Sequence, residues 1–129
     1  MSKDARNNDL NLAPEARESL EQLVALLSKQ EFGEDGPPRD ITFAEIERFG
    51  HRAGQMLARA VDMRMAEQHA AHFEGDEPCP ACGEKCPPKA SPHELPLQTE
   101  DGEVTLREPA FRCPPCERDF FPRAHPATD

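Results

Sequence analysis

The chain has 129 residues, a formal net charge of −10, and only 36% hydrophobic residues, with neither Trp nor Tyr. This length allows one compact domain or two very small ones, so any hydrophobic core must be small. The acidic balance argues against a protein that binds nucleic acid nonspecifically, because phosphate binding draws on Lys and Arg. The sequence shows neither an apolar signal region nor an apolar run long enough to span a bilayer, so we expect a cytoplasmic protein without membrane contact.

The first part of the chain predicts a tail followed by a helix. Residues 1–12 are polar and lack an apolar period, so we expect a disordered tail. Pro14 suits the first helical turn, and apolar residues then recur on one face, which predicts a helix from Pro14 to about Gln30. Residues 33–38 contain two glycines and two prolines, which favour a turn.

A second, longer helix is predicted to begin at Thr42, where Thr42 and Glu45 have the spacing of a capping box. Its apolar stripe continues to Phe73, before Gly75, which gives a helix of about thirty residues. Because this helix is longer than the first, an antiparallel hairpin leaves part of the stripe uncovered. We expect either the following domain or a second copy of the chain to cover it, the latter giving a homodimer through the long helix.

Two Cys-Pro-x-Cys pairs follow, and they predict a metal site. A gap of two residues lets the second thiolate turn back toward the first, so each pair supplies two ligands to a tetrahedral ion. The all-thiolate set predicts one structural Zn²⁺ as the cofactor, and the five cysteines are an odd number for a disulfide framework. The predicted metal ligands are Cys79, Cys82, Cys113 and Cys116.

The thirty residues between the pairs predict a β-hairpin that brings the pairs together. Residues 95–99 and 103–108 flank a Glu-Asp-Gly turn, and Val104 and Leu106 alternate with polar residues. The predicted fold class is therefore α+β, with an N-terminal helical hairpin that includes one long helix, then a small four-cysteine zinc ribbon with a β-hairpin. The predicted divisions are the tail at 1–12, the helical region at 13–75 and the zinc-ribbon domain at 76–129.

Other interpretations of the cysteines remain open. The pair Cys113 and Cys116 has the spacing of a redox dithiol, although such a motif normally opens a helix in a βαβ unit. Iron–sulfur ligation is a further alternative. Cys86 or His93 could replace one of the four ligands, while the plainer interpretation is a spare thiol and an exposed loop histidine.

Arginines interleaved with phenylalanines surround the second pair. We interpret Phe111, Phe120 and Phe121 as the small core of the ribbon, whereas the arginines lack such a structural explanation and are candidates for nucleic-acid contacts. A second basic group on the long helix is better explained as an ordinary solvated face. The candidate nucleic-acid-binding residues are Arg107, Arg112, Arg118 and Arg123.

Catalysis is not expected from this sequence. It has no Gly-rich phosphate loop, no nucleophile with a neighbouring base, and no open metal position that would activate water. We therefore expect a non-enzyme without a small-molecule substrate.

The order of motifs resembles the N-terminal zinc-ribbon region of certain bacterial insertion-sequence transposases of the DDE type. The resemblance covers about residues 42–123. It rests on Cys79-Pro80-Ala81-Cys82-Gly83, on the hairpin at 97–107, on Phe111-Arg112-Cys113-Pro114-Pro115-Cys116 and on Phe120-Phe121-Pro122.

This resemblance implies a role in recognising transposon-end DNA or in assembling a transposase, with the four cysteines at the matching ligand positions. Members of that family continue into an acidic-triad nuclease domain, which this sequence does not contain, so strand transfer is not carried over. The alternative is a zinc-stabilised protein–protein interaction module or regulator that binds no nucleic acid, which the net acidity favours.

Overall fold

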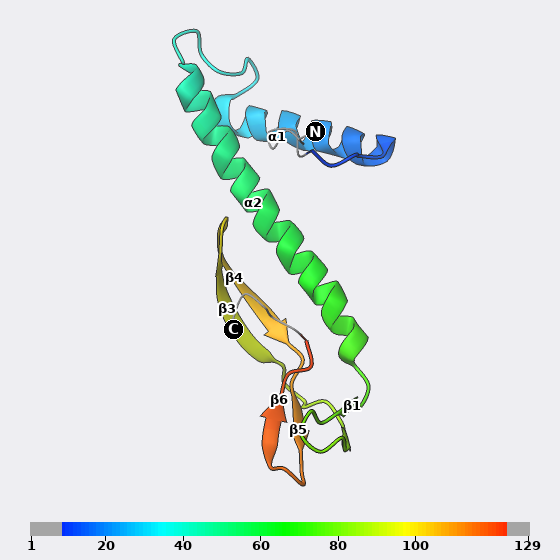
Figure 1. The fold of residues 1–129 in the computed structure, drawn as a ribbon. Helices are drawn as coiled ribbons and strands as arrows, with labels where there is room; N and C mark the ends of the chain where they lie inside the picture. Colours follow the sequence, from blue (N-terminus) through cyan, green and yellow to red (C-terminus); the bar gives the residue numbers. More distant parts are fainter. Residues whose placement is uncertain (1–8, 124–129) are drawn as a thin grey trace, which may run out of the picture. The chain divides into compact units, whose positions relative to one another are not determined.

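The computed structural model describes residues 9–123 and has an α+β fold, in which two helices precede several small hairpins (Figure 1). Helix α1 is Pro14–Phe32 and helix α2 is Phe43–Ala70, which a 3₁₀ turn, η1, extends over Ala71–Phe73. The four cysteines cluster in the C-terminal part. The fold class predicted from the sequence is therefore confirmed, including the long second helix.

The strands form three antiparallel pairs, each a two-stranded sheet. The central pair is the longest, and the two short pairs each carry one Cys-Pro-x-Cys turn. The pairs are β1 (Glu77–Pro78) with β2 (Lys85–Cys86), β3 (His93–Thr99) with β4 (Gly102–Glu108), and β5 (Phe111–Cys113) with β6 (Arg118–Phe120).

Two compact units divide the chain, the first ending at Arg48 and the second beginning at Phe49. The second unit contains most of α2 and all of the strands. The predicted domain boundary near residue 75 stays a prediction. Of the predicted tail, residues 1–8 lie outside the described part, and residues 9–12 have neither helix nor strand.

Local signals define both ends of α1. Pro14 occupies the first turn, and the acidic Glu15 there complements the positive end of the helix dipole. At the other end Gly33 has φ +91° and donates its N–H to the carbonyl of Lys29 at 2.8 Å. Because a residue with a side chain is strained at this φ, glycine ends the helix here. The helix continues two residues beyond the predicted end at Gln30.

The capping box predicted for α2 is present. The N–H of Glu45 donates to Thr42 Oγ1 at 3.2 Å, and the N–H of Thr42 donates to Glu45 Oε1 at 3.0 Å. These bonds satisfy two backbone donors that a helix start would otherwise leave without a partner. The backbone and hydroxyl hydrogen bonds from Thr42 also lower the pKa of Glu45.

The central hairpin has a tighter turn than the sequence predicted. Thr99 pairs directly with Gly102, so only two residues lie between the strands. Thr99 Oγ1 donates to the carbonyl of Gly102 at 2.6 Å and accepts from the N–H of Asp101 at 3.1 Å. Gly102 has φ +122°, and an added Cβ would lie 2.8 Å from Arg59 Nη1. The positive φ favours glycine at this position, whereas the end of the Arg59 side chain could move away from an added Cβ.

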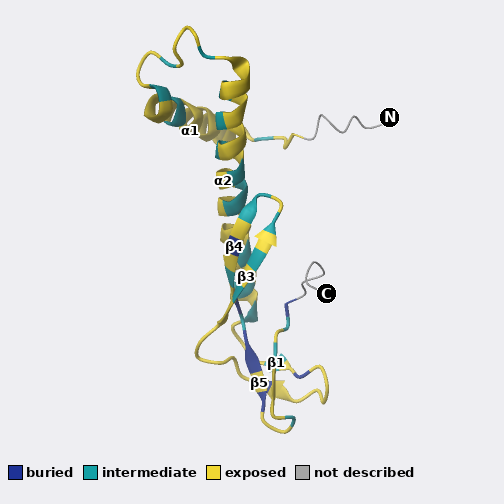
Figure 2. Cartoon of the chain, turned by 90° about the vertical axis from the view of Figure 1, so that its left-hand side faces the viewer, coloured by how far each residue is buried: buried dark blue, intermediate teal, exposed yellow. Residues whose placement is uncertain are grey.

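The buried core lies entirely in the ribbon. Neither α1 nor α2 contains a buried residue, and Figure 2 shows both helices in yellow and teal, whereas β5 is dark blue. Phe111 is fully buried and stacks on Phe120, with ring centroids 5.5 Å apart. Phe121, which we expected in this core, is 45% exposed. Among the described residues, the buried apolar set is Cys79, Cys86, Val104, Ala110, Phe111 and Cys113.

Two arginines connect α2 to the ribbon within the second unit. Arg59 Nη1 donates to the carbonyl of Asp101 in the hairpin turn at 2.6 Å. Arg123 Nη1 donates to the carbonyl of Ala66 at 2.5 Å, and its Nε and Nη2 both donate to Glu108 Oε1, with Nε at 3.0 Å. The side chains of Arg123 and Glu108 are only 4% and 2% exposed, so they form a buried ion pair.

The apolar stripe predicted for the long helix remains largely uncovered. The side chains of Met56, Leu57 and Val61 are 61%, 45% and 41% exposed. The ribbon therefore does not bury this stripe. Within residues 9–123, no helix combines the length and the apolar character that a membrane span requires.

Candidate metal centre

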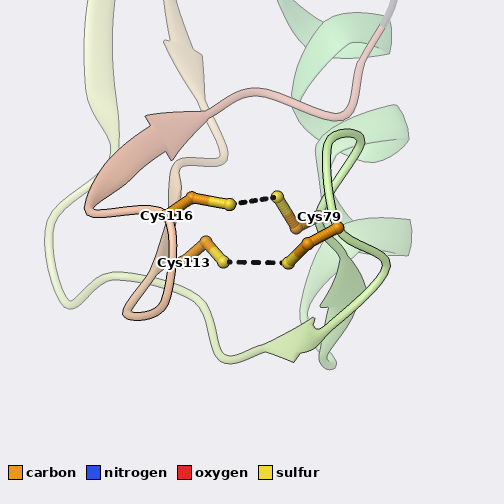
Figure 3. A group of neighbouring side chains, drawn as sticks. Cys79, Cys113 and Cys116 are labelled. Atoms are coloured by element: carbon orange, nitrogen blue, oxygen red, sulfur yellow. Dashed lines mark hydrogen bonds between the residues drawn. The ribbon is translucent and has the colours of Figure 1, made fainter.

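The fold brings the four predicted cysteine ligands together. One pair comes from the turn between β1 and β2, and the other from the turn between β5 and β6, as Figure 3 shows for Cys79, Cys113 and Cys116. The sulfurs of Cys79, Cys82, Cys113 and Cys116 all lie within 4.8 Å of one another. Four thiols this close form a donor set for a single metal ion.

The two cysteine turns have the same backbone design. The N–H of Gly83 donates to the carbonyl of Cys79 at 2.8 Å, and the N–H of Glu117 donates to the carbonyl of Cys113 at 2.7 Å. The residue that donates has a positive φ in both turns, +81° at Gly83 and +54° at Glu117. Glycine adopts this conformation readily, whereas glutamate is strained in it.

Backbone pairing between the two short hairpins places the two turns side by side. An isolated bridge links Pro88 to Phe111, and the N–H of Lys89 donates to the carbonyl of Ala110 at 2.8 Å. The side chain of Lys89 also bonds Asp119 at 2.8 Å. These contacts bring together the two ends of the segment between the cysteine pairs. Thiols that are far apart in sequence therefore become neighbours.

The sulfur separations fit a tetrahedral ion. Four thiolates about 2.3 Å from a zinc ion at tetrahedral angles would lie about 3.8 Å apart. Cys79 Sγ lies 3.9 Å from Cys116 Sγ, a contact that Figure 3 shows as a dashed line. Cys82 Sγ lies 3.5 Å from Cys113 Sγ. Each of these pairs joins one turn to the other, so a bound ion would connect the two short hairpins.

Local hydrogen bonds and mutual contact set different pKa values for the thiols. Backbone N–H groups of Cys82 and then Ala81 point at the sulfur of Cys79 and lower its pKa to about 6. Hydrogen bonds that the Cys116 thiol shares with the sulfurs of Cys82, Cys113 and Cys79 raise its pKa to about 12. Metal binding must therefore displace protons from part of the site, and its affinity will depend on pH.

Cys82 has competing influences on its pKa. The backbone N–H of Glu84 lowers this pKa, whereas the hydrogen bond with Cys113 and partial burial raise it, and the net direction is upward. A backbone N–H group thus points at the sulfur of Cys82, just as backbone N–H groups point at the sulfur of Cys79. Such N–H···S bonds stabilise thiolates that ligate a metal.

Cys86 and His93 lie outside this group of four. Cys86 is fully buried and donates its S–H to the carbonyl of Glu84 at 3.2 Å, and burial followed by contact with Cys113 raises its pKa to about 11. It is therefore a neutral core thiol. The ring of His93 lies 5.3 Å from that of Phe121. Cys113 ends a strand rather than opening a helix, unlike the cysteine of a thioredoxin-type dithiol.

The four candidate nucleic-acid arginines have different environments. Arg123 is buried in the pair with Glu108, so it presents no surface to a phosphate. Arg112 is half exposed and bonds Asp119 at 3.1 Å, and Lys89 and then Arg112 lower the pKa of that aspartate. Arg107 and Arg118 are exposed. The expectation that these arginines lack a structural explanation is therefore wrong for Arg112 and Arg123.

The sequence did not indicate that two polar residues, Glu108 and Arg59, anchor the ribbon. Glu108 reads as the last polar residue of a strand, yet it is buried and binds Arg123, fifteen positions later. Arg59 reads as part of a solvated helical face, yet it bonds the hairpin turn. Glu108 does fall in register with Val104 and Leu106 on the inner face of β4, and this alternation is a signal that could have indicated its burial.

Comparisons with known proteins give this chain no family assignment. No protein-family model, curated protein or solved structure matches it. The transposase-like motif order therefore stays an expectation from the sequence, and the function is inferred from the residues of the site and its surroundings.

Proposed function

We propose that this protein is a non-catalytic interaction module stabilised by one structural Zn²⁺. The ligands are the thiolates of Cys79, Cys82, Cys113 and Cys116. The proposal rests on one observation, which is that these four sulfurs lie within 4.8 Å of one another. Four protein ligands complete a tetrahedral shell, so no position remains at which the ion could activate water.

Zinc is the favoured ion because of the donor set. Tetrahedral all-thiolate sites select Zn²⁺ or iron, and the sulfur separations suit one ion better than a cluster, whose several irons would hold the ligands farther apart. A reduced cytosolic environment, which we expect for this chain, keeps the thiols available for a metal.

A protein partner agrees best with the charges on the surface. The chain carries a net charge of −10, and two of the four arginines proposed for nucleic acid form ion pairs with Glu108 and Asp119. Phosphate contacts need cations that are free to replace counterions. The apolar side chains exposed on the helices, by contrast, suit a protein surface.

DNA recognition is the second candidate function. Three exposed arginines, Arg107, Arg112 and Arg118, flank the second cysteine turn, in the region whose motifs resemble a transposase zinc ribbon. If DNA binds, it would do so through this local surface. The overall charge of the chain would oppose it.

We further propose that a second copy of the chain covers the exposed stripe of α2. Met56, Leu57 and Val61 are exposed there, and Gly50 and Gly54 have nothing within 4 Å of the position of an added Cβ. Glycine inside a helix costs about 1 kcal/mol relative to alanine, and it allows another helix to approach closely. The same stripe on two copies would make a symmetric pair.

Metal analysis tests the zinc proposal. Protein purified under reducing conditions should retain one zinc per chain, and Cys113→Ser should lose it, whereas Cys86→Ser should keep it. Stoichiometric iron in place of zinc, or a folded protein with no metal, would overturn the assignment.

Binding to a labelled duplex separates the two partner classes. A protein module should show no salt-dependent binding even at low ionic strength. If affinity instead falls steeply as salt rises and drops further in Arg118→Ala, the DNA candidate is correct. Arg123→Lys is unsuitable for this test because Arg123 is buried in the fold.

Sedimentation measures the proposed self-association. The parent chain should form a dimer at micromolar concentration, and Leu57→Glu with Val61→Glu should make it monomeric while leaving its zinc content unchanged. A parent chain that stays monomeric at high concentration would contradict the dimer.

A further inference from the structure

A groove runs between the end of α2 and the ribbon, on a part of the molecule that the metal centre does not use. Its cavity volume is about 370 Å³, which lies at the small end of the range for ligand sites. All of its lining residues belong to the second compact unit. The apolar part of the lining consists of Ala70, Ala71, Phe73, Pro88, Pro92 and Pro109.

Three charged side chains also line this groove, namely Glu67, Glu74 and Arg107. None of the three has a hydrogen bond or an ion pair with another described residue. Glu67 and Arg107 also border a smaller neighbouring cavity with Met63 and Thr105, so they lie together at one end of the groove. Glu74, beside Phe73, lines the first cavity alone and lies seven positions after Glu67.

The walls of the groove are held in place by contacts next to it. Arg123 bonds the carbonyl of Ala66, the residue before Glu67, and it also bonds Glu108, the residue after Arg107. The backbone hydrogen bond from Lys89 to Ala110 holds the neighbouring residues Pro88 and Pro109, which line the groove. A groove formed before its ligand arrives loses less entropy on binding.

Arg107 and Glu74 specify what the groove would accept, while Glu67 beside Arg107 weakens the attraction of that end for an anion. Arg107 presents a guanidinium that suits a carboxylate, and Glu74 suits a cationic side chain whose aliphatic stem can lie on Phe73. Glu67 and Glu74 are seven positions apart, which corresponds to about 10 Å along a helix. An extended peptide covers that distance with about three residues.

We propose that the groove between η1 and β4 binds an extended peptide segment of mixed charge, with an acidic and a basic residue about three positions apart and apolar residues between them. This inference depends on the proposed function as a protein-binding module, and it names the chemistry of one partner. A free carboxylic acid or a polyamine would satisfy only one end of the groove.

The test uses the zinc-loaded full chain and three synthetic tetrapeptides, acetyl-Asp-Leu-Pro-Lys-amide, its charge-reversed form acetyl-Lys-Leu-Pro-Asp-amide, and the neutral acetyl-Asn-Leu-Pro-Gln-amide. Backbone amide resonances of ¹⁵N-labelled protein are followed during each titration. We expect at least one mixed-charge peptide to bind with a dissociation constant of about 1 mM, as suits a small exposed interface. The shifts should be confined to residues 67–74 and 107–110.

Variants of the charged residues then test the two ends. Arg107→Ala and Glu74→Gln should each weaken binding about threefold, and together about tenfold, since exposed charge pairs contribute little individually. Arg118→Ala is the control, because it removes an exposed arginine outside the groove lining, and it should bind as the parent does.

Several results would overturn the inference. These are no shifts at 5 mM peptide, shifts outside the groove, or equal binding of the neutral peptide. If the protein keeps its zinc and its dispersed amide spectrum in such a case, the peptide inference fails while the proposed function stands. A protein without bound zinc would instead sink the proposed function.

Discussion

The helices and the ribbon of this protein depend on different kinds of information. Each helix begins at a local signal, Pro14 for α1 and the capping box at Thr42 for α2, yet neither contains a buried residue. The ribbon has only short strands with weak local signals, yet it contains every buried residue in the described part of the chain. The helices are therefore specified by nearby residues, whereas the ribbon is specified by contacts between residues far apart in sequence.

The content of the ribbon core explains this dependence. Three of its six buried apolar residues are cysteines, and two of those, Cys79 and Cys113, are proposed metal ligands. A core this small cannot offset chain entropy by apolar burial alone. If the helices and the ribbon differ in this way, each perturbation should affect one region and spare the other. Four features can be perturbed, namely the metal, the buried ion pair, the cysteine turns and the helix cap.

Removal of zinc should have the largest effect. Binding of a structural zinc is linked to about 10 kcal/mol or more of folding free energy, so chelation should unfold residues 76–123. Since the chain has no Trp or Tyr, amide resonances are the suitable measurement. The ribbon resonances should collapse while helical signal at 222 nm partly remains, and added zinc should restore them. Ribbon resonances that stay dispersed without metal would contradict the comparison.

Breaking the buried ion pair should have the next largest effect. Arg123→Ala removes one side of a buried ion pair, a loss that typically costs about 3 kcal/mol or more. Denaturant unfolding at fixed zinc concentration measures this loss.

Arg112→Ala is the matched control for Arg123→Ala. It also removes an arginine from an ion pair in the ribbon, but Arg112 and Asp119 are 52% and 36% exposed. Exposed pairs contribute about 0–1 kcal/mol, so its midpoint should scarcely move. Equal effects of the two substitutions would mean that burial of the pair at Arg123 does not matter.

The two cysteine turns should respond to substitution with opposite signs. Gly83→Ala places a side chain at φ +81° and should destabilise the ribbon by about 1 kcal/mol, whereas Glu117→Gly relieves a strained φ of +54° and should stabilise it by a similar amount. Thermal unfolding of the zinc-loaded protein compares them. Two changes of the same sign would show that backbone strain is not what distinguishes the turns.

The helix cap should give the smallest effect. Thr42→Ala removes the cap of α2 and should lower helix stability by about 0.5–1 kcal/mol without moving the ribbon resonances. Because the folded pKa of Glu45 lies below its unfolded value, its contribution is present above about pH 4.3 and is lost as pH falls through the lower, folded pKa. Glu45→Gln should remove this pH dependence, measured by ellipticity of the helices between pH 2 and 6.

The sequence allowed prediction of what local chemistry determines. The starts of both helices, the central hairpin and the four clustered cysteines follow from Pro14, from the Thr42 cap, from strand alternation and from the Cys-Pro-x-Cys spacing. The strands β1, β2, β5 and β6 are only two or three residues long, too short for a periodic signal, and they exist because the cysteine turns pair their flanks.

Long-range polar contacts were beyond sequence reasoning. No spacing rule links Arg123 to Glu108 and to the carbonyl of Ala66, because the bonds depend on how the ribbon folds back. For the same reason the sequence predicts Arg123 at the surface and Phe121 in the core, whereas Arg123 is buried and Phe121 is exposed.

The bond between Arg123 and Ala66 has a mechanical consequence. These residues are 57 positions apart, and the interval encloses the whole ribbon. A stretching force applied at Phe49 and Arg123 would pass from Arg123 into the helix through Ala66, and also through Glu108, the hairpin and Arg59, so the cysteine turns would bear little tension until these contacts ruptured. The protein thus places contacts that re-form easily in front of the thiolate bonds that the proposed ion would form.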